Sequence, residues 1–267
     1  MSESTLEQST PQRAINVPVI VIVGILAGFL SGLFGVGGGI LIVPGLVLVA
    51  RMDQRMAHGT SLAGVLPIAA SSLVTYWAHD HIDWPVVLFL AIGAVAGAIL
   101  GTKLLHVLPH RTLGIAFSAL LLASAARLFL SDSGTGRHEL DALMAVSLVV
   151  VGVLTGILAG LLGVGGGIIM VPAMMMFFGI PPVIAKGTSL GVIIPTSIMG
   201  TWRNRTKKNV DFRAAAIVGV AGVLAAVGGG TLSAHMSDTL SSVLFAILLT
   251  VVAVRLLLQL RSEGKKA

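Results

Sequence analysis

The chain has 267 residues, of which 55% are hydrophobic and only 10% are charged, and its 17 Lys and Arg against 11 Asp and Glu give a net charge of +6. An ordinary soluble domain is about 25% charged, so this composition excludes a soluble enzyme, a nucleic-acid-binding module and a disordered regulator. The positive charge indicates basic loops that anchor membrane helices. The absence of cysteine excludes disulfides, thiolate catalysis and thiolate metal sites.

The N-terminal segment is polar and carries Glu3 and Glu7, so we expect residues 1–16 to be a cytoplasmic tail and not a cleavable signal peptide. From Val17 onward the chain alternates between charged loops and uncharged stretches, and all eleven acidic residues lie outside those stretches. The stretches are Val17–Ala50, Leu62–Ala78, Pro85–Thr102, Thr112–Ala126, Ala142–Ala185, Thr188–Trp202, Ala214–Ala234 and Thr239–Val254. A helical span needs about 20 apolar residues, so this pattern predicts an all-α polytopic membrane protein.

Two of these stretches, Val17–Ala50 and Ala142–Ala185, are too long for a single crossing. Each contains a glycine run followed by a proline, Pro44 or Pro172, and both residue types interrupt helices. We therefore expect a break inside each stretch. After the first break, Ile40–Ala50 would rise only about 16 Å as a helix, which favours a partial, re-entrant span over a short full crossing and leaves both open.

The sequence repeats itself without gaps at an offset of 128 residues. Gly35–Ile40 matches Gly163–Ile168, and Gly59–Leu62 matches Gly187–Leu190. Single matches include Gly24 with Gly152, Gly28 with Gly156, Gly32 with Gly160, Pro44 with Pro172, Pro67 with Pro195, Asp83 with Asp211 and Arg127 with Arg255. Chance does not produce this agreement at one offset, so the chain consists of two homologous halves. We expect a first membrane repeat over 17–131, a linker over 132–141, a second repeat over 142–258 and a cytoplasmic tail over 259–267.

Charge predicts that the two halves have opposite orientations. The loop Ala78–Trp84 has no Lys or Arg, whereas its repeat mate is strongly basic; the loop Lys103–Arg111 is basic, whereas its mate Thr231–Thr239 is not. The basic residues of the first mate are Arg203, Arg205, Lys207, Lys208 and Arg213. Cytoplasmic loops are enriched in Lys and Arg, so matched loops face opposite sides and both termini are cytoplasmic. Two inverted repeats with broken or re-entrant helices at the glycine motifs are typical of secondary transporters.

The glycine runs form the first candidate site. Backbone groups bared by a helix break survive in a membrane only when they are buried in protein or line a wet cavity. A helix start carries about half a positive charge and attracts anions, so the runs can cradle an anion near the midplane. The alternative is that they only permit close helix packing, as we expect for the ladders at 24/28/32 and 93/97/101. The candidate residues are Gly37, Gly38, Gly39, Gly165, Gly166 and Gly167.

The second candidate site consists of the matched motifs His58–Ser61 and Lys186–Ser189. Each begins with a basic residue and continues Gly-Thr-Ser at the expected start of a helix, where hydroxyls and terminal amides can cradle an oxyanion. Plain helix capping is the alternative. Lys186 is the only charged residue between Asp141 and Arg203, which favours a functional role. The candidate residues are His58, Gly59, Thr60, Ser61, Lys186, Gly187, Thr188 and Ser189.

The remaining polar residues suggest capping and limit the substrate class. Asp83 and Asp211 precede expected helices and are predicted to cap them. No carboxylate lies inside an uncharged stretch, which disfavours a cation as substrate. If transport is linked to protons, His58 is the best candidate, because histidine changes charge near neutral pH. His79 and His81 are expected on an exposed loop, and neither a metal nor another cofactor is expected.

The segment Gly32–Gly39 with Pro44, the motif Gly59–Ser61 and their copies in the second half closely resemble the TauE/SafE family of sulfite exporters and related permeases. The resemblance covers residues 17–258. It implies a transporter of the inner (cytoplasmic) membrane for a small sulfur-containing anion such as sulfite or an organosulfonate, working by alternating access around a midplane site between the repeats. We expect export, although the motif does not fix the direction. Thiosulfate-importing relatives rely on cysteines, which this chain lacks.

Three other functions compete with this one. They are a permease for another small anion, a non-transporting membrane partner protein and an intramembrane hydrolase. The hydrolase is disfavoured because Gly59-Thr60-Ser61 is followed by Leu62 and because Lys186 stands where His58 would have to serve as the base. The expected partners are therefore a small anion and the lipid bilayer, with coupling to protons or a counter-ion left open and no nucleic acid.

Overall fold

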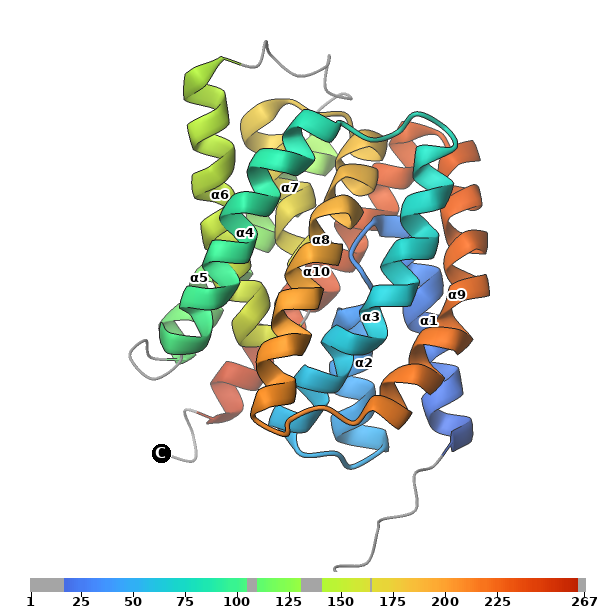
Figure 1. Ribbon diagram of the computed structural model, residues 1–267. Helices are drawn as coiled ribbons and strands as arrows, with labels where there is room; N and C mark the ends of the chain where they lie inside the picture. Colours follow the sequence, from blue (N-terminus) through green and yellow to red (C-terminus); the bar gives the residue numbers. More distant parts are fainter. Residues whose placement is uncertain (1–16, 105–109, 131–140, 164, 264–267) are drawn as a thin grey trace, which may run out of the picture.

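The computed structural model describes residues 17–104, 110–130, 141–163 and 165–263. The expected tail 1–16, the linker 132–141 apart from its last residue, and the end of the tail 259–267 lie outside these residues, as do positions 105–109 of the expected basic loop. Regular structure in the described part is helical throughout (Figure 1). The elements are α1 (Val17–Phe34), α2 (Gly39–Pro44), η1 (Gly45–Val49), α3 (Gln54–Trp77), α4 (Trp84–Leu104), α5 (His110–Leu130), α6 (Ala142–Leu162), α7 (Gly167–Phe178), α8 (Pro182–Thr206), α9 (Phe212–His235) and α10 (Asp238–Glu263).

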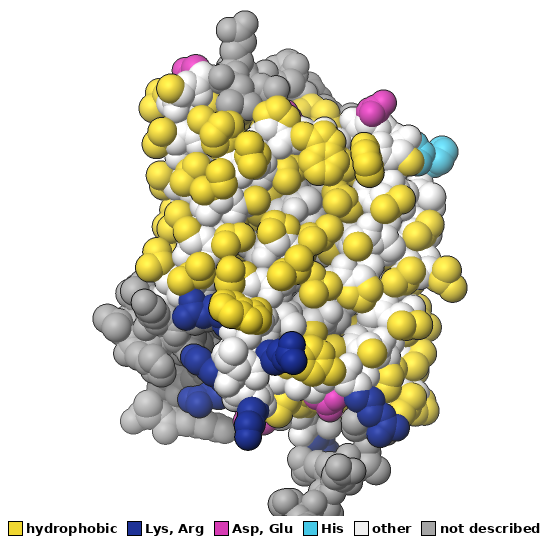
Figure 2. Space-filling view, viewed as in Figure 1, with side chains coloured by type: hydrophobic (Ala, Val, Ile, Leu, Met, Phe, Trp, Pro, Cys, Tyr) yellow, Lys and Arg dark blue, Asp and Glu magenta, His cyan; other side chains and the backbone are white. Residues whose placement is uncertain are grey.

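Seven of the described helices are long and apolar enough to cross a membrane, namely α1, α3, α4, α6, α8, α9 and α10. Many of their large apolar side chains face outward; Leu224 is 82% exposed and Leu143 74%. Figure 2 shows hydrophobic side chains spread over the middle of the visible face. Exposed apolar surface on this scale indicates a protein whose solvent is lipid. The prediction of an all-α polytopic membrane protein is confirmed.

Both long uncharged stretches are broken at their glycine run, as predicted. Gly35, Gly37 and Gly38 have φ angles of +67°, +77° and +74°, which residues with a Cβ rarely adopt. A new helix, α2, starts at Gly39 and continues as the π-helical turn η1, with Pro44 at the junction. In the second half Gly163, Gly165 and Gly166 have φ angles of +66°, +81° and +84°, and α7 starts at Gly167.

The segment after the first break returns along α1 instead of crossing. A Cβ on Gly38 would lie 2.6 Å from the carbonyl oxygen of Ala27, and a Cβ on Gly45 would lie 2.7 Å from the side chain of Val23. The contact point on α1 moves toward its N-terminus as the segment proceeds, so the two run antiparallel. In Figure 1, α2 runs from mid-height back to the end of the molecule at which α1 begins. Ile40–Ala50 is therefore the partial span that its short rise favours.

The two halves interlock. The most extensive helix contacts, including α1 on α9, α4 on α6, α3 on α8 and α5 on α10, all join one half to the other. The glycine ladders make the first two contacts close: a Cβ on Gly28 would lie 2.1 Å from the carbonyl oxygen of Gly222, and one on Gly97 would lie 2.1 Å from that of Val153. The prediction that these ladders serve helix packing is confirmed.

Turns that match in the sequence repeat lie at opposite ends of the molecule. Figure 1 shows the α3–α4 turn at the top and the α8–α9 turn at the bottom, where α1 also begins and α10 ends. The lower end carries Lys207 and Lys208 in the α8–α9 turn, and Figure 2 shows most Lys and Arg side chains of the visible face gathered there. The two ends of the molecule thus differ sharply in charge.

We predict that Gly28→Ala destabilises the protein, because the added Cβ would overlap the backbone of Gly222 and force α1 away from α9. Overpacking of this kind costs about 1–3 kcal/mol of unfolding free energy. Gly228→Ala is the matched control, since no atom lies within 4 Å of its Cβ position. Monodispersity of detergent-purified protein after heating measures both variants. Equal midpoints for the two would contradict the packing role of the ladder.

Candidate functional site

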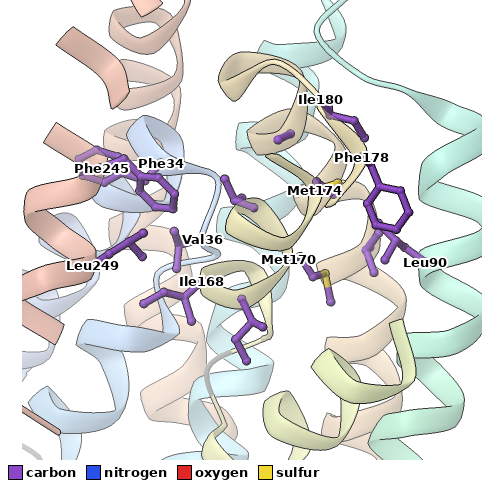
Figure 3. Packing of buried hydrophobic residues seen from close by; sticks show 14 of the residues in the cluster. Phe34, Val36, Leu90, Ile168, Met170, Met174, Phe178, Ile180, Phe245 and Leu249 are labelled. Carbon is purple, nitrogen blue, oxygen red and sulfur yellow. The ribbon is translucent and has the colours of Figure 1, made fainter. Parts of the chain in front are cut away.

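The two glycine bends meet at the centre of the molecule. A Cβ on Gly167 would lie 2.8 Å from the carbonyl oxygen of Gly35 and 2.9 Å from Cα of Val36. Figure 3 shows Val36 and Ile168, from the two bends, close to the ring of Phe34. In α2 the Leu41 and Ile42 amides bond to the Gly38 carbonyl, and in α7 the Ile169 and Met170 amides bond to that of Gly166, so only the first two amides of each helix have no acceptor within it. The structure thus brings the predicted glycine motifs of both halves together.

Each bend packs on the basic residue of the opposite half. A Cβ on Gly35 would lie 2.5 Å from the carbonyl oxygen of Lys186, and a Cβ on Gly163 would lie 2.9 Å from Cα of His58. Both contacts bring a left-handed glycine against a helix backbone. The two predicted sites are therefore one assembly, in which α8 supports the first bend and α3 supports the second.

Apolar side chains fill the space between the bends. Cβ atoms on Gly37 and Gly165 would both meet Ile193 and Val65, at distances of 3.1–3.8 Å. Val65 and Ile193 are repeat mates and are 0% exposed. Gly38 and Gly166 pack elsewhere, against Ala27 and Ala159, whereas a Cβ on Gly167 would lie 2.7 Å from Ile193. Of the glycine candidates, Gly37, Gly165 and Gly167 thus lie against the central side chains.

The expectation that the Gly-Thr-Ser motifs begin a helix is wrong. α3 starts at Gln54, where the side chain of Asp53 accepts a hydrogen bond from the Arg55 N–H at 3.0 Å. α8 starts at Pro182, well before Lys186. Both motifs therefore lie inside a helix, where backbone amides bond to the preceding turn. Their hydroxyls, and not terminal amides, are the groups they offer to a ligand.

The threonines of these motifs clamp the turns that precede α4 and α9. The Asp83 N–H donates to Oγ1 of Thr188 at 3.0 Å, and the Asp211 N–H donates to Oγ1 of Thr60 at 2.9 Å. Asp83 and Asp211 cap α4 and α9 by accepting from Val86 and Ala214, which confirms the capping prediction. Gly187 and Gly59 pack against the backbone carbonyls of His81 and Asn209. The two halves are thus joined by the hydrogen bonds of Thr60 and Thr188 and by the backbone packing of Gly59 and Gly187.

The serines of the two motifs differ. The Ser189 hydroxyl lies 2.6 Å from the carbonyl oxygens of both Gly35 and Lys186, so it ties α8 to the first bend. Ser61, its repeat mate, is 0% exposed, and its hydroxyl has no hydrogen-bond partner. A buried hydroxyl in this condition costs about 1–3 kcal/mol. Ser61 is therefore the hydroxyl of the motif pair that remains available to a ligand or a water.

Lys186 places a cation in the interior. Its side chain is 1% exposed, and its ammonium donates to the hydroxyl of Ser241 on α10. The ammonium lies 5.5 Å from the ring centroid of Phe34 and 6.0 Å from that of Phe245, two rings that stack at 5.6 Å. Aromatic faces favour a cation. His58, the repeat mate, is half-buried beside the second bend.

Sequence reasoning missed Tyr76 and its repeat mate Asn204. Tyr76 is 1% exposed, and its hydroxyl lies 2.9 Å from the carbonyl oxygen of Gly32 and 3.0 Å from Oγ of Ser233. Asn204 lines a small crevice with Gly165 and Gly200. The signal was present, because Tyr76 is the only tyrosine of the chain and it falls at a repeat position occupied by a smaller residue.

Among the described residues no three His, Asp or Glu side chains are placed to hold a metal ion. His79 and His81 stack at 6.0 Å, and the His235 ring lies 6.1 Å from that of His79. The Nδ1 atoms of His79 and His235 each lie 2.8 Å from a backbone carbonyl oxygen of their own helix or its end, at Thr75 and Thr231.

Comparison with known proteins gives consistent matches over the chain. The sequence model of the family described as "Sulfite exporter TauE/SafE" matches residues 3–145 and 148–267. The "Probable membrane transporter protein YunE" of Bacillus subtilis is 28% identical over 275 residues, which cover 92% of this chain and 97% of that protein. A "Probable membrane transporter protein" of Xylella fastidiosa is 30% identical over 78% of this chain and 80% of its own length. A further one, from Methanocaldococcus jannaschii, is 30% identical over 69% of this chain and 70% of its own length.

We predict that Thr188→Val destabilises the protein in the absence of any substrate, because the Asp83 N–H loses its acceptor. Loss of a hydrogen bond of this kind, which is partly buried, costs about 0.5–1.5 kcal/mol. Thr188→Ser keeps the acceptor oxygen and is the matched control. Thermal unfolding in detergent, followed by tryptophan fluorescence, measures both. A valine variant as stable as the serine variant would contradict the clamp.

Proposed function

The chain belongs to the sulfite exporter TauE/SafE family and is a membrane transporter, and on that premise we propose that it exports a small sulfur-containing anion, sulfite or an organosulfonate, by alternating access. The site lies at the meeting of the two glycine bends. Family and relatives indicate a transporter and not an enzyme.

The buried ammonium of Lys186 is the observation that carries the choice of an anion. It lies 5.5 Å from the ring centroid of Phe34, the residue before the first glycine bend, and its side chain is 1% exposed. It donates to the hydroxyl of Ser241 on α10. An ionisable side chain at this depth is costly and usually marks a substrate pathway. The bared amides of α2 and α7 and the Ser61 hydroxyl supply further donors to an oxyanion.

The charge distribution supports an inverted arrangement of the repeats in the cytoplasmic membrane. Matched turns lie at opposite ends of the molecule, and the end with Lys207 and Lys208 also holds the start of α1 and the end of α10 (Figure 1). Cytoplasmic loops are enriched in Lys and Arg. We therefore assign the basic end to the cytoplasm, with both termini there and the repeats over 17–131 and 142–258.

Two other functions give different results in the same assay. A permease for another small anion would move acetate or phosphate in preference to sulfite. A non-transporting membrane partner would move none of these anions, and its function would survive both Lys186→Ala and Ser189→Ala.

We predict that purified protein in liposomes moves sulfite or an organosulfonate in preference to acetate, and that Lys186→Met reduces this flux by on the order of tenfold or more. Loss of one charge-assisted hydrogen bond to an anion costs about 1.5–3 kcal/mol. Methionine keeps most of the side-chain volume between Phe34 and Phe245. The measurement is uptake of labelled anion with and without a pH gradient.

Lys208→Met is the matched control, since Lys208 is exposed in the α8–α9 turn. It should retain the parental flux. Well-folded parental protein that moves no sulfur-containing anion would overturn the proposed substrate, and an unchanged flux in Lys186→Met would overturn the role of the buried cation.

If export is coupled to protons, we expect His58 to carry the titration. Histidine is the side chain that changes charge between about pH 5 and 8, and His58 lies half-buried beside Gly163. The flux of the parent should then change over this range, and that of His58→Gln should be nearly flat. His235→Gln, which alters an exposed histidine, is the control. Full pH dependence in His58→Gln would remove His58 from the coupling.

A further inference from the structure

A narrow crevice of about 10 Å³, room for about one water molecule, lies between α8 and the second glycine bend, and most of its lining is buried. Gly165, Thr196, Gly200 and Asn204 line it, together with side chains of α3, α4 and α6. Three of these residues lie on one face of α8, because they are spaced four residues apart: Thr196, Gly200 and Asn204. The crevice therefore runs from the cytoplasmic end of α8 inward to the second glycine bend.

The repeat mates of these residues lie at the first glycine bend and on α3. In the sequence repeat, Gly37 matches Gly165, Ile68 matches Thr196, Ser72 matches Gly200 and Tyr76 matches Asn204. The Tyr76 side chain is 1% exposed, and its hydroxyl bridges Gly32 on α1 and Ser233 on α9. A phenol ring thus occupies the position at which the shorter Asn204 leaves a crevice.

Two buried hydroxyls accompany Tyr76 on its closed side. Ser72 lies one turn before it on α3, and Ser31 directly precedes Gly32; both are 0% exposed and their hydroxyls have no hydrogen-bond partner. Their repeat mates, Gly200 and Ala159, line the crevice. Buried hydroxyls in this condition are unfavourable by about 1–3 kcal/mol each. They suit a wall that faces water in another state of the protein.

Helix packing shows the same asymmetry. α3 packs on α9 more extensively than its repeat mate α8 packs on α4. The tighter contact is on the side of Tyr76 and Ser233, and the looser one is on the side of the crevice, to which α4 contributes Ala98. Matched pairs of helices therefore pack more closely on the side of Tyr76 than on the side of the crevice.

We propose that Tyr76 is the outer gate of the transporter, that the crevice at Asn204 marks its cytoplasmic entrance, and that this structure is an occluded state in which the outer side is the more tightly closed of the two. The inference rests on the proposed alternating-access function and adds to it a gating residue and a sidedness. In the outward-open state Tyr76 leaves Gly32 and Ser233, Ser31 and Ser72 become hydrated, and α8 closes on α4 around Asn204.

The natural absence of cysteine makes the full-length chain a ready background for accessibility measurements. Thr196→Cys places a thiol in the crevice, and Ser72→Cys places one on the closed side. A membrane-impermeant methanethiosulfonate carrying a trimethylammonium group is applied to right-side-out cells and to inside-out vesicles, and modification rates are measured by mass shift. This reagent is a cation, so the readout does not depend on an anion substrate.

The expected result is that Thr196→Cys reacts from the cytoplasmic side and that Ser72→Cys reacts at least tenfold more slowly from either side. Adding Tyr76→Asn should raise the rate at Ser72→Cys from the outside by tenfold or more, and adding Asn204→Tyr should protect Thr196→Cys. Tyr76→Phe keeps the ring and loses both hydroxyl contacts, so it should also raise the outside modification rate of Ser72→Cys, by a smaller factor. This variant replaces Tyr76→Asn in the test if the asparagine variant does not fold.

An outside rate at Ser72→Cys that neither Tyr76 variant changes would overturn the gate. Reaction of Thr196→Cys only from the outside would overturn the sidedness. Neither result bears on the substrate: protein that moves sulfite without the predicted labelling refutes the gate alone, and protein with the predicted labelling but no sulfur-anion flux refutes the substrate alone.

Discussion

A membrane interior has no water to satisfy backbone polar groups, and this constraint governs the fold around the two glycine bends. Each bend interrupts a helix and takes backbone groups out of the regular helical hydrogen bonding, so neither can face lipid. The bends lie instead at the centre, where Gly167 touches the backbone of Gly35 and each bend rests on a helix of the opposite half. A single half could not enclose its own broken helix, which explains why the most extensive helix contacts all run between halves.

The closely packed helix pairs differ from α3 and α8 in the residues that they carry. α1 against α9 and α4 against α6 approach so closely at their glycines that a single Cβ would overlap the facing backbone, and close packing resists sliding. α3 and α8, by contrast, carry Tyr76, Asn204, His58 and Lys186, the residues that differ between the halves. Thr60 and Thr188 then connect these helices to the turns before α9 and α4, so a movement of α3 or α8 would be passed to a partner in the other half.

The sequence was sufficient for features that depend on local chemistry or on the repeat. Glycine runs and proline predicted the breaks, Asp83 and Asp211 were recognised as caps, and the small-residue ladders as packing surfaces. The starts of α3 and α8 were missed, because Asp53 and Pro182 extend the helices backward past the conspicuous glycine. The surroundings of Lys186 could not be foreseen either, since Phe34, Ser241 and Phe245 come from helices far apart in sequence. Tyr76 could not be found by matching identical residues of the repeat, because it stands at a position where the halves differ.

On the proposed alternating-access mechanism, those differences decide which of the two states is lower in energy. A strictly symmetric pair of inverted repeats would have inward-open and outward-open states of equal energy, because each would be the image of the other. Tyr76 breaks this equality: two hydrogen bonds contribute about 1 kcal/mol each, and burial of an aromatic side chain about 1.5–3 kcal/mol, whereas Asn204 can bury far less at the mate position. About 1.4 kcal/mol corresponds to a tenfold change in population, so this one pair of residues is large enough to favour the state in which Tyr76 is buried. A substrate anion bound near Lys186 would then have to offset that bias, which couples loading of the site to release of the outer gate.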